Sequence, residues 1–299
     1  MFFIIALCAT FAYALQGVLM AKVYRQSDQL SAVAYRGLSL LISMSPLLLL
    51  VPHSAYADFL GQLAWLLLAA SLAAVANWAN AIAFVRLPVG IASALSMAFT
   101  ALFVALLGQF FLNEQLSLQQ WLMGGITLVA VLLLGASQAR KAKQVASQAA
   151  YTQYKPLTGI VASACYGGLM SYALVLVASM SRSSHPFLVG YAWEVMIGVV
   201  AMFIAVGRGL FSSKGGFQSL SMANFKQILM YASPTVIGTA SYALAMTLGP
   251  LAIAAAILST MMVFSMLLGW WFLKEKPSMQ QWVTMSLVCF SVIGLKLVA

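Results

Sequence analysis

The sequence predicts an all-α polytopic membrane protein whose ten transmembrane helices form a 5 + 5 inverted repeat. Three observations lead to this prediction: an apolar composition, ten apolar runs of spanning length, and one stretch that occurs twice. Hydrophobic residues make up 63% of the 299 positions and charged residues only 7%, whereas a soluble domain is roughly 25% charged. The net charge of +10 does not indicate nucleic-acid binding, because the basic residues lie in short loops between apolar runs.

A helix that crosses a bilayer needs about 20 mostly apolar residues. The first apolar run is interpreted as an uncleaved span, because its first positive charge, Lys22, follows the run instead of preceding it. Charged residues, proline or glycine separate the runs. The predicted spans are residues 2–21, 31–51, 60–84, 88–112, 118–138, 157–180, 186–207, 226–247, 250–273 and 279–298.

The repeated stretch reads LLGQFFLNEQLSLQQW at 106–121 and LLGWWFLKEKPSMQQW at 267–282. Such a repeat in an apolar chain indicates duplication of a membrane unit. Because each unit holds five spans, an odd number, the second unit must enter the membrane in the opposite direction. The predicted organisation is a first repeat at 1–138, a basic linker at 139–156 and a second repeat at 157–299.

Basic residues are distributed unequally between the two predicted membrane faces. By the positive-inside rule this places the linker in the cytoplasm and both termini outside. The opposite face receives only Arg182 and Lys296. The basic face receives Lys22, Arg25, Arg86, Arg140, Lys141, Lys143, Lys155, Arg208, Lys214, Lys226, Lys274 and Lys276.

The repeated motif fits a structural role better than a chemical one. In each copy a serine three residues before a glutamine matches a capping box, which satisfies the first amides of a helix. A carboxylate just before such a helix start commonly interacts with the helix dipole. Substrate binding by Glu114 or Glu275 is therefore the weaker interpretation. The boxes are Ser117 with Gln120 and Ser278 with Gln281.

These junctions, Glu-x-x-Ser-x-x-Gln after an apolar helix, make the chain resemble the ten-helix EamA-type permeases of the drug/metabolite transporter superfamily. The duplicated layout and the position of Arg36 support the resemblance, which covers essentially the whole chain. It implies a transporter with a central cavity formed by helices one, three, four, six, eight and nine. Members of the family move amino acids, nucleosides, drugs and other metabolites. The chain departs from the family pattern where Asn113 and Lys274 replace a frequent Gly, and where Glu194 replaces a second Arg.

Two charged residues lie within predicted spans. Glu194 is about eight residues into its helix, and its charge must be paired, exposed to a water-filled cavity or protonated. A role in proton coupling or in binding a solute amine is one hypothesis for it. Gly190 and Gly198, four residues to either side, could admit a partner helix. Arg36 lies nearer its helix end, and snorkelling to the basic face is the preferred interpretation.

Polar residues elsewhere in the spans are candidates for the cavity lining. Gln16, Asn77 and Asn80 would be the most costly to expose to lipid, so they should face the interior. Hydroxyl groups such as those of Thr100 and Thr239 are weaker evidence, because each can bond to its own helix. The proposed substrate-binding set is Tyr13, Gln16, Asn77, Trp78, Asn80, Ser96, Tyr166, Tyr242 and Ser259.

No cofactor, metal site or catalytic constellation is predicted. His53 and His185 stand alone in predicted loops, and the three cysteines, Cys8, Cys165 and Cys289, are interpreted as small core residues. The expected function is a secondary transporter in the plasma (bacterial inner) membrane that moves a small organic solute. Proton coupling and function as a monomer are compatible with this. The alternative is an integral membrane enzyme that acts on a lipid or prenyl substrate.

Overall fold

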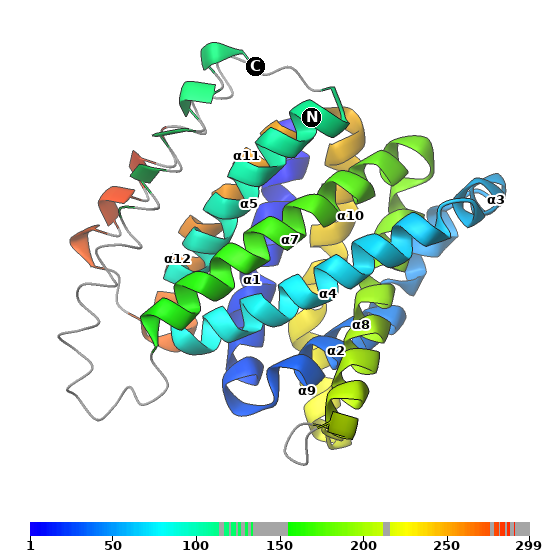
Figure 1. The fold of residues 1–299 in the computed structure, drawn as a ribbon, viewed down its shortest axis with the longest axis horizontal. Helices are drawn as coiled ribbons and strands as arrows, with labels where there is room; N and C mark the ends of the chain where they lie inside the picture. The colour runs from blue at the N-terminus through cyan, green and yellow to red at the C-terminus, as the bar shows by residue number, and fades with distance from the viewer. Residues whose placement is uncertain are drawn as a thin grey trace.

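A computed structural model of the protein describes residues 1–113, 155–211 and 216–275, with individual positions between 117 and 133 and between 278 and 290. All regular secondary structure in these residues is helical, which confirms the predicted all-α class for this part of the chain (Figure 1). The repeated-motif residues Glu114, Gln120 and Gln281 lie outside the described residues, as does the linker apart from its last two positions.

Seven helical segments in the described residues are long and apolar enough to cross a membrane, and they match seven of the ten predicted spans. Two of them are pairs of helices joined by short turns, α9 with α10 and α11 with α12. The segments are α1 (Phe2–Gln26), α4 (Leu63–Arg86), α5 (Val89–Phe111), α7 (Pro156–Ser183), α8 (Pro186–Phe211), α9 (Met222–Ala232) with α10 (Pro234–Leu248), and α11 (Leu251–Ser259) with α12 (Met261–Leu273).

The predicted span at 31–51 is not one continuous α-helix. It consists of α2 (Gln29–Ser43) and a 3₁₀ helix, η1 (Ser45–Leu50). The change coincides with Pro46, which lacks the amide proton that an α-helix would use at that position. A short helix, α3 (Ser54–Leu60), then leads into α4. The predicted spans at 118–138 and 279–298 lie mostly outside the described residues.

Two predicted spans are interrupted in the middle. Between α9 and α10 the chain passes Ser233 and Pro234, and the proline begins the new helix. Between α11 and α12 there is no proline or glycine. There the hydroxyls of Ser259 and Thr260 donate to the carbonyls of Ala256 and Ile257. Side-chain hydroxyls that bond back to their own helix in this way favour bending.

Helices from the two predicted repeats pack between one another. In Figure 1 the blue α1 and the yellow α10 run side by side behind the green α7. α7 contacts α4 and α5, and α1 makes corresponding contacts with α10, α11 and α12. α2 packs against α8, and α5 against α11 and α12. These are the pairings expected if each element of the first repeat has a counterpart in the second.

Two residues adopt a left-handed backbone at matching places in the repeated stretch. Asn113 follows α5 with φ 54°, and Lys274 follows α12 with φ 59°. Glycine takes up this conformation most readily, and it commonly ends a helix there. The structure therefore gives a physical reason for the glycine that the family pattern often has before the Glu, and shows that this chain forms the same turn without it.

The prediction that the cysteines are core residues is wrong for the two that are described. Cys8 and Cys165 are both exposed on the bundle surface. The outer surface of a membrane protein faces lipid and is itself apolar, so a small apolar residue is not driven inward as it would be in water. Cys289 lies outside the described residues.

Candidate functional site

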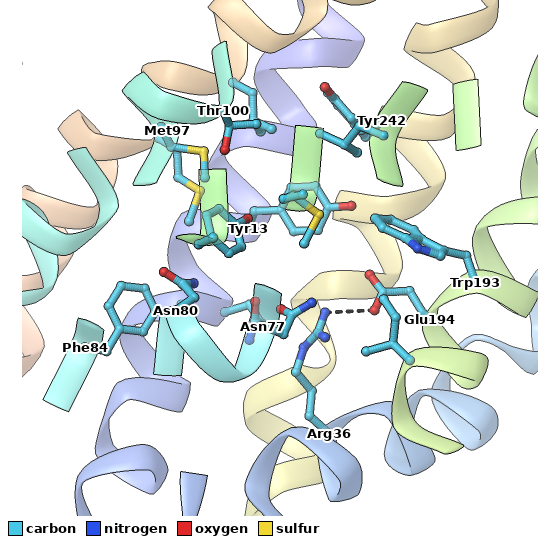
Figure 2. Close-up of a pocket in the computed structure, with 18 of the residues that line it drawn as sticks. Tyr13, Arg36, Asn77, Asn80, Phe84, Met97, Thr100, Trp193, Glu194 and Tyr242 are labelled. Atoms are coloured by element: carbon cyan, nitrogen blue, oxygen red, sulfur yellow. Dashed lines mark hydrogen bonds and ion pairs between the residues drawn. The ribbon is translucent and has the colours of Figure 1, made fainter. Parts of the chain in front are cut away.

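A cavity lies in the centre of the bundle, between the two predicted repeats (Figure 2). It brings together eight of the eleven residues that the sequence singled out: Tyr13, Gln16, Arg36, Asn77, Asn80, Tyr166, Glu194 and Tyr242. These residues come from α1, α2 and α4 of the first repeat and from α7, α8 and α10 of the second. Sequence reasoning thus selected residues that meet in space, while their role in binding a solute stays a prediction.

Three of the eleven residues do not line the cavity. Ser96 is buried on α5 and donates a hydrogen bond to Asn80 Oδ1 at 3.1 Å, so it contacts a lining residue. Trp78 lies on α4 beside Arg208, whose guanidinium carbon is 6.0 Å from the centre of the indole ring. Ser259 is buried at the break between α11 and α12, where its hydroxyl bonds to its own helix.

The charged centre of the cavity is an ion pair between Arg36 and Glu194. Arg36 Nη2 lies 2.9 Å from Glu194 Oε2, and the side chains are 4% and 2% exposed. The expectation that Glu194 is paired, one of three offered, is met. The expectation that Arg36 snorkels to the basic face is wrong, because its side chain points into the bundle toward Glu194 (Figure 2). Opposite charges a few ångströms apart attract each other strongly in a low-dielectric interior, and Glu194 supplies such a partner for the guanidinium.

A close crossing of α2 and α8 brings the two charges together. Gly37 follows Arg36, and a Cβ placed on it would lie 2.3 Å from the Cα of Gly198, one turn beyond Glu194. Only glycine at both positions lets the two backbones approach this closely. The expectation that Gly198 admits a partner helix is therefore met. Gly190 has a looser role, since its Cβ would contact Thr239 Cγ2 on α10 at 3.0 Å.

The second oxygen of Glu194 accepts a hydrogen bond from a threonine hydroxyl, which in turn is bonded to a tyrosine hydroxyl. Thr239 Oγ1 donates to Glu194 Oε1 at 2.8 Å, and Tyr13 Oη lies 2.9 Å from the same Thr239 oxygen. Because Thr239 has a single hydroxyl proton and gives it to the carboxylate, Tyr13 must be the donor in the second bond. α1, α10 and α8 are thereby connected through one carboxylate, and both of its oxygens accept a hydrogen bond.

The amides on α4 are held by their own surroundings. Asn77 Nδ2 donates to the carbonyl of Ala73 at 2.8 Å, one turn earlier on the same helix. Asn80 Oδ1 accepts from Ser96, whose carbonyl in turn accepts from the hydroxyl of Thr100. These bonds orient the two amides within the cavity wall. They engage the nitrogen of the Asn77 amide and the oxygen of the Asn80 amide.

Most of the remaining lining could not be selected from sequence. Apolar and aromatic residues in apolar spans carry no signal that distinguishes a cavity wall from a packed core or a lipid-facing surface. Thr100 was one of the hydroxyl residues treated as weaker evidence, and the one sequence signal for Trp193 is its position next to Glu194. The other lining residues are Gly17, Tyr24, Phe84, Met97, Met170, Leu174, Ile197, Leu258 and Met261.

A second charged cluster lies at one end of the bundle, away from the cavity lining. Arg25 Nη2 lies 2.7 Å from Glu275 Oε1, and Arg25 Nε donates to the carbonyl of Phe84. Glu275 Oε2 accepts from the amide of Val89 at 2.9 Å. The structural interpretation of the repeated glutamate fits these contacts, and one amide that Glu275 satisfies is the first of α5, a helix of the other predicted repeat.

Asp28 forms a further ion pair at this end. Its Oδ1 lies 2.6 Å from Arg208 Nη2, while Oδ2 accepts from the amide and hydroxyl of Ser31 and so caps α2. Partial burial acting alone would raise the pKa of the Asp28 carboxyl. The hydrogen bonds from Arg208 and Ser31 outweigh burial and lower this pKa below its usual value.

The fold and the cavity define a polytopic helical membrane protein with an internal polar chamber. The chain belongs to the EamA-like transporter family, whose model matches residues 1–136 and again residues 155–297. Membership makes it a membrane transporter of the drug/metabolite type. Among solved structures, one crystal structure is similar over 98% of this chain and 96% of its own, with 13% identity and a TM-score of 0.62, which supports the fold alone. The search among curated proteins gave no significant match.

Proposed function

We propose that the protein is a secondary transporter that binds a small organic solute in the central cavity and moves it by alternating access. The observation that carries the proposal is the buried Arg36–Glu194 pair in the wall of a cavity between the two predicted repeats. Taking two charges out of water costs free energy that an apolar core would avoid. Charged residues inside a membrane commonly mark the path of a solute or an ion.

In this proposal, the movement that exposes the cavity to each side of the membrane in turn comes from the inverted 5 + 5 repeat. In such transporters one repeat rocks against the other around a site near the middle of the membrane. The matched pairings of α1 and α7, and the paired left-handed residues Asn113 and Lys274, support it. So do Arg25 and Arg182, whose Nε atoms donate to the carbonyls of Phe84 and Met246 at equivalent helix ends.

We place the protein in the plasma (bacterial inner) membrane with the 139–156 linker in the cytoplasm. The support is the charge of the bundle end that holds the Arg25–Glu275 pair, since cytoplasmic ends are enriched in Lys and Arg. Among the described residues, the basic residues near the ends of α1, α4 and α8, near the starts of α7 and α9 and directly after α12 are Lys22, Arg25, Arg86, Arg208, Lys155, Lys226 and Lys274. Arg182 lies at the other end of α7 from Lys155.

Solute binding is tested by thermal stabilisation of the purified protein across a metabolite library, followed by uptake of each hit into proteoliposomes. A solute that stabilises the protein and is taken up unchanged is the expected result. A compound that is chemically converted would favour the alternative of a membrane enzyme acting on a lipid or prenyl substrate, and would contradict the transporter proposal. Uptake with one chain per liposome would support function as a monomer.

Proton coupling at Glu194 is tested separately. Glu194 is the one acidic residue within the described membrane spans, and it is ion-paired with Arg36. Glu194→Gln keeps acceptor and donor groups at the site but cannot change charge. We expect this variant to lose uptake driven by a pH gradient and to retain solute exchange. Gradient-driven uptake equal to that of the wild type would contradict coupling at this residue.

A further inference from the structure

The cavity contains hydrogen-bond donors that the protein itself does not use. Arg36 bonds Glu194 through Nη2 alone, and its Nε and Nη1 have no partner among the described residues. The same is true of Nε1 of Trp193, a side chain that is 5% exposed. A buried donor without an acceptor loses the free energy of its bond to water. Both side chains line the cavity, so a bound molecule with an acceptor group could restore these bonds (Figure 2).

The charge inside the cavity restricts what that molecule can be. Arg36 and Glu194 neutralise each other, and the other described lining residues are uncharged. An anion would leave a net negative charge in a low-dielectric interior, and a cation would leave a net positive one, each at a large desolvation cost. A zwitterion has no net charge, but both of its charged groups would have to leave water. The donors left unused on Arg36 and Trp193 require only an acceptor, which an uncharged molecule can supply without that cost.

The shape of the lining adds a second restriction. Six aromatic side chains contribute to it: Tyr13, Tyr24, Phe84, Tyr166, Trp193 and Tyr242. Their rings offer faces and edges to a planar ring in offset-stacked or edge-to-face contacts. The amides of Gln16, Asn77 and Asn80 add further polar groups that can orient such a ring.

Building on the transport function proposed above, we propose that the cavity recognises an uncharged aromatic or heteroaromatic solute through a carbonyl acceptor. The carbonyl oxygen accepts from the unused donors of Arg36 and Trp193, and the ring packs among the aromatic side chains. The Arg36–Glu194 ion pair stays intact when the solute binds. The site thus selects for absence of charge on the solute as well as for its shape.

The test uses four compounds with one indole ring and different charges: indole-3-acetamide (uncharged), indole-3-acetate (anion), tryptamine (cation) and tryptophan (zwitterion). Affinities for the purified full-length protein are measured at neutral pH by calorimetry and thermal shift. The acetamide is expected to bind at least about tenfold more tightly than the other three, a factor that corresponds to one hydrogen bond to a charged donor. Equal or tighter binding of any charged compound, or no binding of the acetamide, would overturn the proposal.

Variants test the donors directly. Trp193→Phe keeps the ring but removes Nε1–H, and Arg36→Lys keeps the charge but removes the guanidinium fork. Each is expected to weaken acetamide binding about tenfold. Trp65→Phe, in a tryptophan of α4 that is 56% exposed and outside the cavity lining, should bind like the wild type and serves as the control. If Arg36→Lys fails to fold, Trp193→Phe alone decides, and unchanged affinity in that variant contradicts the proposal.

Uptake into proteoliposomes separates this proposal from the transport function. Binding of the acetamide without uptake would support the recognition site and count against the transporter proposal. Uptake of indole-3-acetate in preference to the acetamide would support transport and overturn the recognition of an uncharged solute.

Discussion

Two arginine–glutamate ion pairs of this molecule differ in how deeply they are buried and in the other groups that they contact. Arg36 and Glu194 form an almost fully buried pair in the cavity, whereas Arg25 and Glu275 are 30% and 24% exposed at the basic end of the bundle. The exposed pair connects helix ends: Glu275 also accepts from the first amide of α5, and Arg25 also donates to the last turn of α4. In the buried pair, two of the three guanidinium nitrogens have no partner among the described residues.

This difference separates a charge held at a helix junction from a charge held in the cavity wall. Glu275 belongs to the repeated motif, and its two oxygens contact the Val89 amide and the Arg25 guanidinium. Glu194 belongs to no motif, and it is the residue at the centre of the cavity. A glutamate that recurs in sequence thus marks a helix junction, while a glutamate that stands where the first repeat has Arg36 lies at the candidate site.

Breaking the buried pair should have the largest effect. Arg36→Met leaves Glu194 buried without its cation, and we expect a loss of about 3–5 kcal/mol in the free energy of unfolding. Replacing both residues, as in Arg36→Met with Glu194→Leu, should recover most of that loss, because an apolar pair has no charge to desolvate. Chemical denaturation in detergent measures both. A double variant as unstable as the single one would show that packing, and not the uncompensated charge, is responsible.

The helix crossing that positions the pair should come next. Gly198→Ala would place a Cβ 2.7 Å from backbone atoms of Gly37 and push α2 away from α8. We expect a loss of about 1–3 kcal/mol in the free energy of unfolding, as is usual for overpacking. Solute binding in the cavity should weaken too.

The matched control for this crossing is Gly207→Ala. It lies on the same helix, and its Cβ would meet nothing within 4 Å. The control should be neutral or slightly stabilising, because alanine favours helices over glycine. Equal thermal shifts for the two alanine variants would contradict the role assigned to the crossing.

The exposed pair should matter less and should depend on salt. Glu275→Gln retains an acceptor for the Val89 amide but removes the charge, so only the ion pair with Arg25 is lost. An ion pair with this exposure contributes up to about 1 kcal/mol, and salt screens it. Melting temperatures of the variant and the wild type should therefore converge as salt is raised. A gap that persists in molar salt would mean that the pair is not acting through its charge.

The smallest expected effect is the pH dependence at Asp28. Its pKa is lowered in the folded protein, so its ionised form stabilises the fold. That contribution is complete above the unfolded pKa of about 4 and is lost as pH falls through the lower folded value. Asp28→Asn should thus be less stable than the wild type near neutral pH, by less than about 1 kcal/mol, and the difference should shrink below about pH 4. Asp58→Asn, an exposed carboxylate, is the control. A difference that grows on acidification would contradict this sign.

Prediction from sequence succeeded where the physics is local. The apolar length needed to cross a bilayer predicted the seven spans that the structure describes. The cost of placing an amide in lipid placed Gln16, Asn77 and Asn80 in the interior, where they line the cavity. The sequence could not identify Met97, Met170 or Met261 as lining residues, because an apolar side chain is equally acceptable in a core, in a cavity wall or against lipid.

Prediction failed where the outcome depended on residues far apart in the chain. The sequence shows an arginine near a helix end and favours snorkelling, but 158 residues separate Arg36 from Glu194. Their meeting depends on the crossing of α2 and α8 at Gly37 and Gly198. The sequence indicated that Gly198 could admit a partner helix, but not which helix it would be. Similarly, no sequence pattern shows that Glu275 accepts from the first amide of α5, which lies 186 residues away.

The sequence by itself determined that this is a helical membrane protein with a duplicated chain and a few polar residues that must avoid lipid. Those conclusions depend on composition, length and self-similarity, which are properties of the chain alone. Only the tertiary structure decided which charges pair, which helix each glutamate serves and which donors remain unused in the cavity. Ion pairs and hydrogen bonds act over a few ångströms, so they are set by the packing of helices and not by distance along the sequence.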